Sequence, residues 1–121
     1  MFHVVLVNPE IPPNTGNVIR LCANTGATLH LVEPLGFDLS EAKLRRAGMD
    51  YAEVASVSVH PDWAACRKAL GGARLFALTT KAGRLLQDSA FRPDDAFVFG
   101  TESRGLPADL LAEIGEDCQL R

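Results

Sequence analysis

Near its start the chain reads Phe2-His3-Val4-Val5-Leu6-Val7, and directly after it Asn8-Pro9-Glu10-Ile11-Pro12-Pro13-Asn14. The first stretch is apolar and rich in β-branched residues, which is typical of a strand buried on both faces of a parallel sheet. The second contains three prolines, which fix φ and remove backbone donors, so it predicts a loop. Apolar positions at helical spacing then predict a helix over residues 15–24, with Asn14 or Thr15 as its N-cap and Gly26 as its stop.

Strand and helix patterns alternate along the rest of the chain. Further strands are predicted at residues 28–32, 54–59, 74–79 and 96–99, and helices at residues 40–47, 61–70 and 107–114. Residues 118–121 look like the opening of one more strand. This alternation predicts an α/β fold with a mostly parallel sheet and flanking helices, in a single domain over residues 1–121.

The composition, 47% hydrophobic and 22% charged over 121 residues, is that of a folded protein. No apolar run approaches the ~20 residues of a membrane span, and the short N-terminal stretch indicates a strand and not a signal peptide. We therefore expect a cytoplasmic protein without membrane contact. Three cysteines and three histidines are scattered without a CxxC pair or zinc-ligand spacing, so the spacing predicts free buried thiols and no metal site; these residues are Cys22, Cys66, Cys118, His3, His30 and His60.

The charge is unevenly distributed. Residues 1–87 carry nine Lys/Arg and seven Asp/Glu, a balance of +2, whereas residues 88–121 carry three and eight, a balance of −5. The net charge of −3 argues mildly against a monomer that grips nucleic acid by bulk electrostatics. The basic residues of the first part either gather into one face or remain scattered solvated charges.

Three segments follow predicted strands and are the candidates for a ligand site, since parallel α/β sheets bind ligands beyond the carboxyl ends of their strands. They are residues 8–16, 79–83 and 100–107. In the first, helix amides and Arg20 suit an anion, although a capped helix with a surface arginine explains the same residues at least as well. In the third, two glycines flank Glu102 and Arg104, which fits either a close approach of backbone to ligand or a tight turn with an exposed ion pair.

Taken together and in this order, the segments resemble a known family. The run Asn8-Pro9-Glu10-Ile11-Pro12-Pro13-Asn14-Thr15-Gly16-Asn17-Val18-Ile19-Arg20-Leu21-Cys22-Ala23-Asn24-Thr25-Gly26 is similar to the first motif of the SPOUT-class 2′-O-ribose methyltransferases. The run Phe97-Val98-Phe99-Gly100-Thr101-Glu102-Ser103-Arg104-Gly105-Leu106-Pro107 is similar to their second. Residues 44–51 and 75–81 narrow the resemblance to the small single-domain tRNA (cytidine(34)-2′-O)-methyltransferases.

The resemblance implies a SPOUT α/β domain with a trefoil knot, a homodimer, S-adenosylmethionine as cofactor without a metal, and methylation of the wobble ribose of leucine tRNA at its anticodon stem-loop. It assigns positions to each role. The catalytic positions are Arg20, Asn14 and Glu102; the cofactor-binding positions are Leu78, Thr79, Gly100, Glu102 and Gly105; and the RNA-binding positions are Arg20, Arg45, Arg46 and Lys81.

The chemistry suits an arginine, because the enzyme must align the hydroxyl oxygen with the methyl group and stabilise the developing alkoxide. A guanidinium with a pKa above ~12 is a poor base. We therefore expect Arg20 to act as an electrostatic clamp, and the residue that removes the proton stays unassigned.

Family members carry a third motif beyond the point that corresponds to Arg121. For a protein that ends at Arg121 we therefore expect an incomplete knot, weak or absent cofactor binding and no methylation. The alternatives are a related enzyme acting on another RNA, a catalytically inactive RNA-binding or dimerisation module, and a flavodoxin-like nucleotide-binding domain. The flavodoxin-like alternative is disfavoured, because this sequence has no glycine- or hydroxyl-rich phosphate loop after its first strand.

Overall fold

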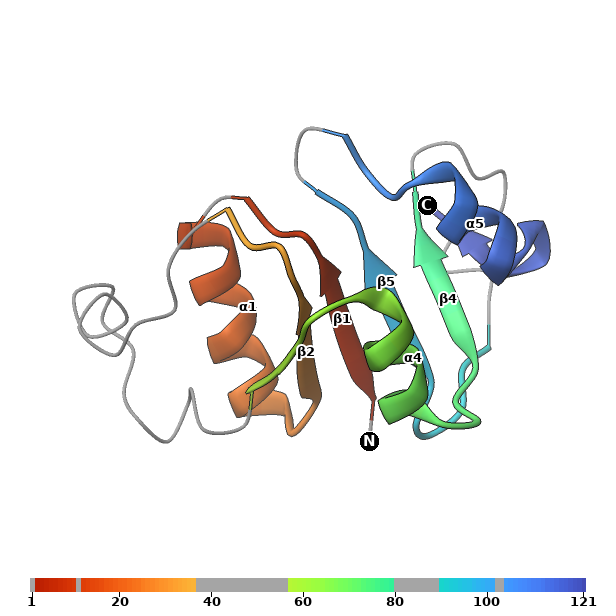
Figure 1. Ribbon diagram of the computed structural model, residues 1–121. Helices are drawn as coiled ribbons and strands as arrows, with labels where there is room; N and C mark the ends of the chain where they lie inside the picture. Colours follow the sequence, from red (N-terminus) through yellow and green to blue (C-terminus); the bar gives the residue numbers. More distant parts are fainter. Residues whose placement is uncertain (1, 11, 37–56, 80–89, 102–103) are drawn as a thin grey trace.

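A computed structural model describes residues 2–10, 12–36, 57–79, 90–101 and 104–121, with only the backbone described at residues 12–16 and 116. Its centre is a six-stranded sheet in the order β3-β2-β1-β5-β4-β6 (Figure 1). Every paired strand runs parallel to its neighbour. The strands are β1 (His3–Val7), β2 (Thr28–Val32), β3 (Val57–His60), β4 (Leu75–Leu78), β5 (Ala96–Phe99) and β6 (Gln119–Leu120). The predicted parallel α/β sheet is confirmed.

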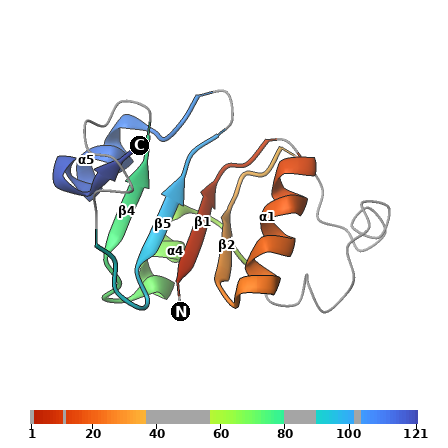
Figure 2. The ribbon, with the colours of Figure 1, turned by 180° about the vertical axis from the view of Figure 1, so that it is seen from behind.

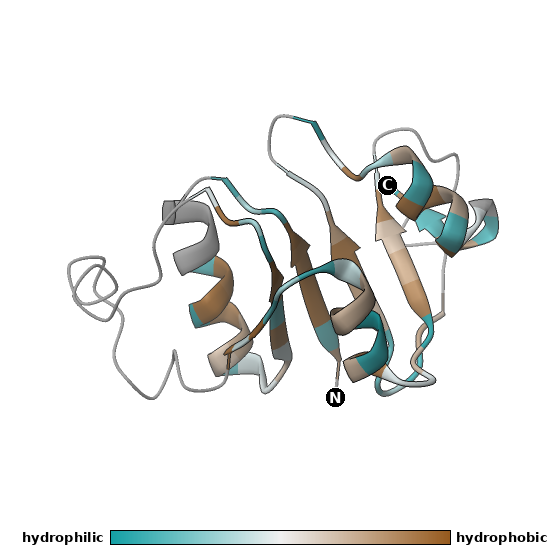
Figure 3. Ribbon diagram, viewed as in Figure 1, coloured by the Kyte–Doolittle hydropathy of each residue, from teal (hydrophilic) through white to brown (hydrophobic). Residues whose placement is uncertain are grey.

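Helices lie on both faces of this sheet. Helix α1 (Pro12–Thr25) covers one face at β2, while α4 (Trp63–Leu70) lies on the other, as the opposite views of Figures 1 and 2 show; α5 (Ala108–Ile114) lies beside β4. The strands are the most apolar part of the molecule (Figure 3). No helix in the described part of the chain is long and apolar enough to cross a membrane.

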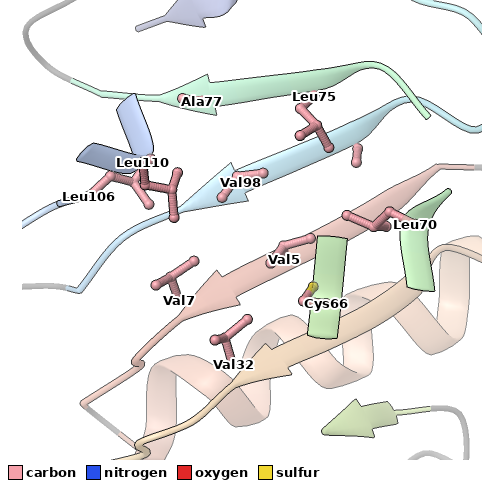
Figure 4. Close-up of a cluster of buried hydrophobic side chains, with 11 residues drawn as sticks. Val5, Val7, Val32, Cys66, Leu70, Leu75, Ala77, Val98, Leu106 and Leu110 are labelled. Atoms are coloured by element: carbon pink, nitrogen blue, oxygen red, sulfur yellow. The ribbon is translucent and has the colours of Figure 1, made fainter. Parts of the chain in front are cut away.

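Two apolar cores form, one on each face, because successive strand residues point to opposite sides. The core under α4 and α5 is the larger, and Figure 4 shows its side chains converging from four strands and the two helices; it contains Val5, Val7, Val32, Cys66, Leu70, Leu75, Ala77, Ala96, Val98, Leu106 and Leu110. The core under α1 contains Ile19, Cys22, Leu29 and Leu31. The strands are thus buried on both faces, as their apolar runs predict.

The element boundaries differ from the sequence expectation at prolines and caps. Helix α1 begins at Pro12, three residues before the predicted start at Thr15, because proline is tolerated in a first helical turn. Asn14 and Thr15 therefore lie inside the helix, and the prediction that one of them is its N-cap is wrong. Helix α4 begins at Trp63, after Asp62 caps it by accepting a hydrogen bond from the Ala65 amide at 2.8 Å.

Other expectations are close to the observed elements. Strands β2 and β5 match their predicted bounds, and the strand expected at residues 118–121 is β6. Strand β3 is described from Val57 to His60, and the earlier part of its predicted range, residues 54–56, lies outside the described residues. Gly26 follows α1 with φ 80°, as expected for a helix stop. The helix predicted at residues 40–47 lies outside the described residues.

An ion pair joins the residue just before β4 to the residue just before β5. The guanidinium of Arg74 donates from Nε and Nη2 to the two carboxylate oxygens of Asp95, at 2.9 and 2.7 Å. The Asp95 side chain is 2% exposed, and the Arg92 amide also donates to it at 2.7 Å. The hydrogen bonds from Arg74, more than any other influence, hold the pKa of Asp95 below its usual value. The carboxylate therefore stays charged inside the fold.

The turn after β5 folds back on itself. Thr101 and Gly105 form an isolated antiparallel bridge, with the Gly105 amide donating to the Thr101 carbonyl at 2.9 Å. A Cβ atom on Gly100 would overlap the backbone of Gly105 and Leu106, and Gly105 has φ 70°. Both glycines are therefore required by the turn itself, one for a close backbone approach and the other for a left-handed conformation.

We expect Gly100→Ala to lower the free energy of unfolding by about 1–3 kcal/mol, the usual cost of forcing extra atoms into packed structure. Urea unfolding followed by circular dichroism measures this change. Gly72→Ala is the matched control, since nothing lies within 4 Å of a Cβ there and no positive φ is required. Equal unfolding midpoints for the two variants would contradict the assignment.

Candidate active site

The loops expected to carry chemistry begin side by side at one edge of the sheet. In the parallel registers, Leu6 of β1 and Leu78 of β4 both pair with Phe99 of β5. The chain leaves all three strands in the same direction, toward the upper edge in Figure 1. The segments after β1, β4 and β5 are therefore neighbours, which is the arrangement that a single ligand site at this edge requires.

The positions predicted to bind cofactor lie at this edge where the structure describes them. Leu78 ends β4, and Thr79 follows it and donates its amide to the Leu120 carbonyl of β6 at 2.8 Å. Gly100 follows β5 next to them and opens the folded-back turn that contains Gly105. The structure thus brings together four of the five predicted positions; Glu102 lies outside the described residues. Their role in binding stays a prediction.

Arg20 lies on α1, at a partly buried position beside fully buried Ile19. The sequence placed it one turn into a helix starting at Thr15. Because α1 begins at Pro12, Arg20 is more than two turns in, about 12 Å along the axis at ~1.5 Å per residue. The first-turn amides and Arg20 therefore lie at different levels of the helix, so the shared anion site expected from both does not follow.

Of the other predicted positions, Asn14 is described only in its backbone, and Arg45, Arg46 and Lys81 lie outside the described residues.

Asn8 is a residue that the sequence analysis did not single out. It ends β1 in a left-handed conformation, φ 53°, and its side-chain amide donates to the carbonyls of Val32 and Pro34 at 3.2 and 3.3 Å. The Gly36 amide donates to the Pro9 carbonyl at 2.9 Å. These bonds tie the loop after β1 to the loop after β2. An asparagine just after a buried strand was the available signal, because asparagine adopts positive φ more readily than most residues.

A cleft of about 470 Å³ opens between α4 and α5, and it is acidic. Four carboxylates line it: Glu33, Asp62, Asp109 and Glu113. The indole N–H of Trp63 donates to Glu113 across the cleft at 2.5 Å. Phosphates are repelled by such a lining. This cleft therefore does not favour a polyanionic ligand.

Three histidines form a row across the α4 face of the sheet. His3 Nδ1 lies 3.1 Å from His30 Nε2, and His30 Nδ1 lies 2.9 Å from His60 Nε2. Burial, followed by the neighbouring His3 and His60, lowers the pKa of His30 to about 4, so its ring is neutral near pH 7. Cys66 reaches the same place from α4, and burial raises the pKa of its thiol to about 11. The sequence spacing gave no sign of this cluster, because its members come from three strands and a helix.

Comparisons with known proteins fit this architecture. Residues 1–120 match the SpoU rRNA Methylase family. A protein of Burkholderia ambifaria named tRNA (cytidine(34)-2'-O)-methyltransferase is 59% identical over 100% of this chain and 79% of its own length. The Escherichia coli (strain K12) protein of the same name is 48% identical over 100% of this chain and 77% of its own length.

A solved structure described as giving insights into the 2-OH methylation of C/U34 on tRNA superimposes with a TM-score of 0.88 at 46% identity. The superposition covers 99% of this chain and 78% of that one. Family, sequence and three-dimensional agreement thus extend over nearly every residue. The chain belongs to the SpoU methylase family.

Proposed function

We propose that this protein transfers the methyl group of S-adenosylmethionine to the ribose 2′-hydroxyl of nucleotide 34 in tRNA. The observation that carries the proposal is the similarity, at 48–59% identity over the whole of this chain, to relatives named for that reaction. The agreement includes both motif segments, whose parent strands β1 and β5 are direct neighbours in the sheet.

A related enzyme acting on ribosomal RNA is the alternative that the family description itself favours. We prefer tRNA because relatives that are 54–59% identical share a tRNA-specific name, whereas an AdoMet-bound rRNA methyltransferase structure is 22% identical and supports only the fold. The two substrates are distinguished by the RNA that gains a methyl group.

The residues at the sheet edge fit an adenosyl cofactor. Leu78 supplies an apolar surface, and the half-exposed backbone at Gly100 and the open side of Gly105 permit a ligand to approach main-chain groups closely. S-adenosylmethionine supplies a methyl group that is already activated on a sulfonium. The remaining task for the protein is to hold the ribose oxygen in line with that methyl and to stabilise its developing negative charge.

Arg20 is our choice for that charge stabilisation. A guanidinium is a forked hydrogen-bond donor and has no acceptor, so we propose that Arg20 binds the oxygen or the adjoining phosphate and does not remove the proton. Asn14 and Glu102 are proposed to organise the part of the site around Arg20. Three further positions are proposed to contact RNA: Arg45, Arg46 and Lys81. A basic surface away from the acidic cleft is consistent with the positive balance of residues 1–87.

We further propose that the protein acts in the cytoplasm, that its substrate is a leucine tRNA, that the chain takes part in a trefoil knot, and that it works as a homodimer.

An apolar groove of about 560 Å³ supports the dimer. It runs along β1, β5 and α1, and three of its large side chains are exposed: Phe2 at 42%, Leu21 at 60% and Phe99 at 38%. A second copy that covered these side chains would remove them from water, which is favourable.

Activity is tested with purified protein that includes the third motif of the family, together with S-adenosylmethionine and a leucine tRNA transcript. We expect one 2′-O-methyl group per tRNA, located at nucleotide 34 by nuclease digestion and mass spectrometry. A transcript with a 2′-deoxyribose at that nucleotide is the control and should gain none. Methylation of ribosomal RNA in its place would favour the alternative substrate.

Arg20→Lys tests the clamp, because it keeps the charge but loses the two-pronged donor geometry. We expect the single-turnover rate to fall by about 10²–10³-fold, the usual effect of removing one oxyanion donor. Arg67→Lys, on an exposed position of α4, is the matched control and should leave the rate unchanged. An undiminished rate in Arg20→Lys would remove the clamp from the mechanism.

Leu21→Arg tests the dimer surface, since it places a charge on the most exposed apolar side chain of the groove. Sedimentation equilibrium should show a wild-type dimer and a weakened or monomeric variant. Val59→Arg is the control, because Val59 is 43% exposed on β3 but does not line the groove. The surface is wrongly assigned if Leu21→Arg sediments like Val59→Arg.

A further inference from the structure

The cluster on the α4 face contains two imidazoles and a thiol at the separation of metal ligands. The ring nitrogens of His30 and His60 and the Sγ of Cys66 all lie within 4.8 Å of one another. His30 lies on β2, His60 ends β3, and Cys66 projects from α4 toward β1 and β2, as Figure 4 shows. We propose that these three residues bind a thiophilic divalent ion, Zn²⁺, at a site separate from the methylation edge.

The separation of the two imidazole nitrogens is close to that of two ligands of one zinc ion. Zinc–nitrogen bonds of about 2.0 Å and a zinc–sulfur bond of about 2.3 Å place tetrahedral ligands roughly 3.3–3.6 Å apart. His30 Nδ1 and His60 Nε2 are already 2.9 Å apart, so they need to separate by a few tenths of an ångström. The Sγ of Cys66 lies within 4.8 Å of both nitrogens, so side-chain rotation has to bring it closer for the three atoms to share one ion.

The proton arrangement also suits a metal. A neutral His30 has one ring N–H, and donating it from Nε2 to His3 Nδ1, 3.1 Å away, leaves the Nδ1 lone pair directed at the site. His3 then orients a ligand by accepting its second N–H, as the outer partners of metal-bound histidines generally do. His60 has to carry its proton on Nδ1, so that its Nε2 lone pair faces the ion.

Binding exchanges one bond of the thiol for another. The S–H bond of Cys66 breaks, its proton passes to solvent, and the thiolate sulfur bonds to the ion, while both imidazoles bind neutral. Two nitrogens and a sulfur are a ligand set that zinc favours over magnesium or calcium. His60 is only partly buried, so the ion enters from its side and water completes the coordination there.

The location indicates a structural ion and not a catalytic one. The three ligands belong to β2, to the neighbouring strand β3 and to the helix that packs across them. A bound ion would join these elements by coordination bonds at a point where, among the described strands, β3 pairs with β2 alone. The methyl-transfer edge lies beyond the ends of β4 and β5, so the proposal stands whether or not the proposed reaction is correct.

Cobalt and zinc test the site in the purified, reduced, metal-free protein. We expect one equivalent of Co²⁺ to bind with the visible bands of a tetrahedral ion and a sulfur-to-cobalt charge-transfer band, and Zn²⁺ to displace it and raise Tm. Cys66→Ser should lose the sulfur band and bind Zn²⁺ at least about 10-fold more weakly. His3→Phe should keep the band while weakening affinity by about 10–100-fold, the range for a lost outer partner.

Cys22→Ser is the matched control, because Cys22 is also buried but lies in the core on the opposite face. It should keep the band and the zinc affinity. Circular dichroism verifies folding, and His60→Gln, at a less buried ligand, provides a second loss of affinity if Cys66→Ser does not fold. The proposal is overturned by a wild-type protein that binds neither ion, by a sulfur band that survives Cys66→Ser, or by one that disappears in Cys22→Ser.

Discussion

The arrangement of the molecule depends on the parallel pairing of β1 with both β2 and β5. Because β1 runs in the same direction as each neighbour, the loops that follow these strands leave at one edge. Side chains of β1 also alternate between the two cores, with Val5 and Val7 under α4 and α5 and Val4 and Leu6 toward α1. One strand thus sets both the position of the candidate active site and the burial that holds the helices in place.

At the candidate active site, backbone conformation and close backbone contacts restrict the choice of residues more than side-chain chemistry does. Gly100 has no room for a Cβ atom, and Asn8 turns the chain in a conformation that few residues adopt readily. These requirements explain why the second motif carries two glycines even before any ligand is considered. The described part of residues 100–107 is a tight turn, and a turn that exposes backbone is compatible with a ligand beside it.

The sequence predicted the parallel sheet and most of its strands, because apolar β-branched runs separated by glycine and proline are governed by local chemistry. It placed the start of α1 wrongly, because the fixed φ and missing N–H of two successive prolines are compatible both with a loop and with a first helical turn. The family and the identities of the site residues came from motif resemblance and not from periodicity. Spacing alone could not have revealed the row of His3, His30 and His60, because their proximity arises from the register of three strands.

The distribution of charge and polarity divides the molecule into faces with different tasks. The cleft between α4 and α5 is lined by carboxylates, and beneath α4 the imidazole row and Cys66 replace part of an otherwise apolar core. The opposite face carries α1 with Arg20 and the exposed apolar groove. The carboxylates of the first face repel a polyanionic substrate. The proposed RNA contact and self-association are therefore assigned to the α1 side and its adjoining edge, and the proposed metal site to the α4 side.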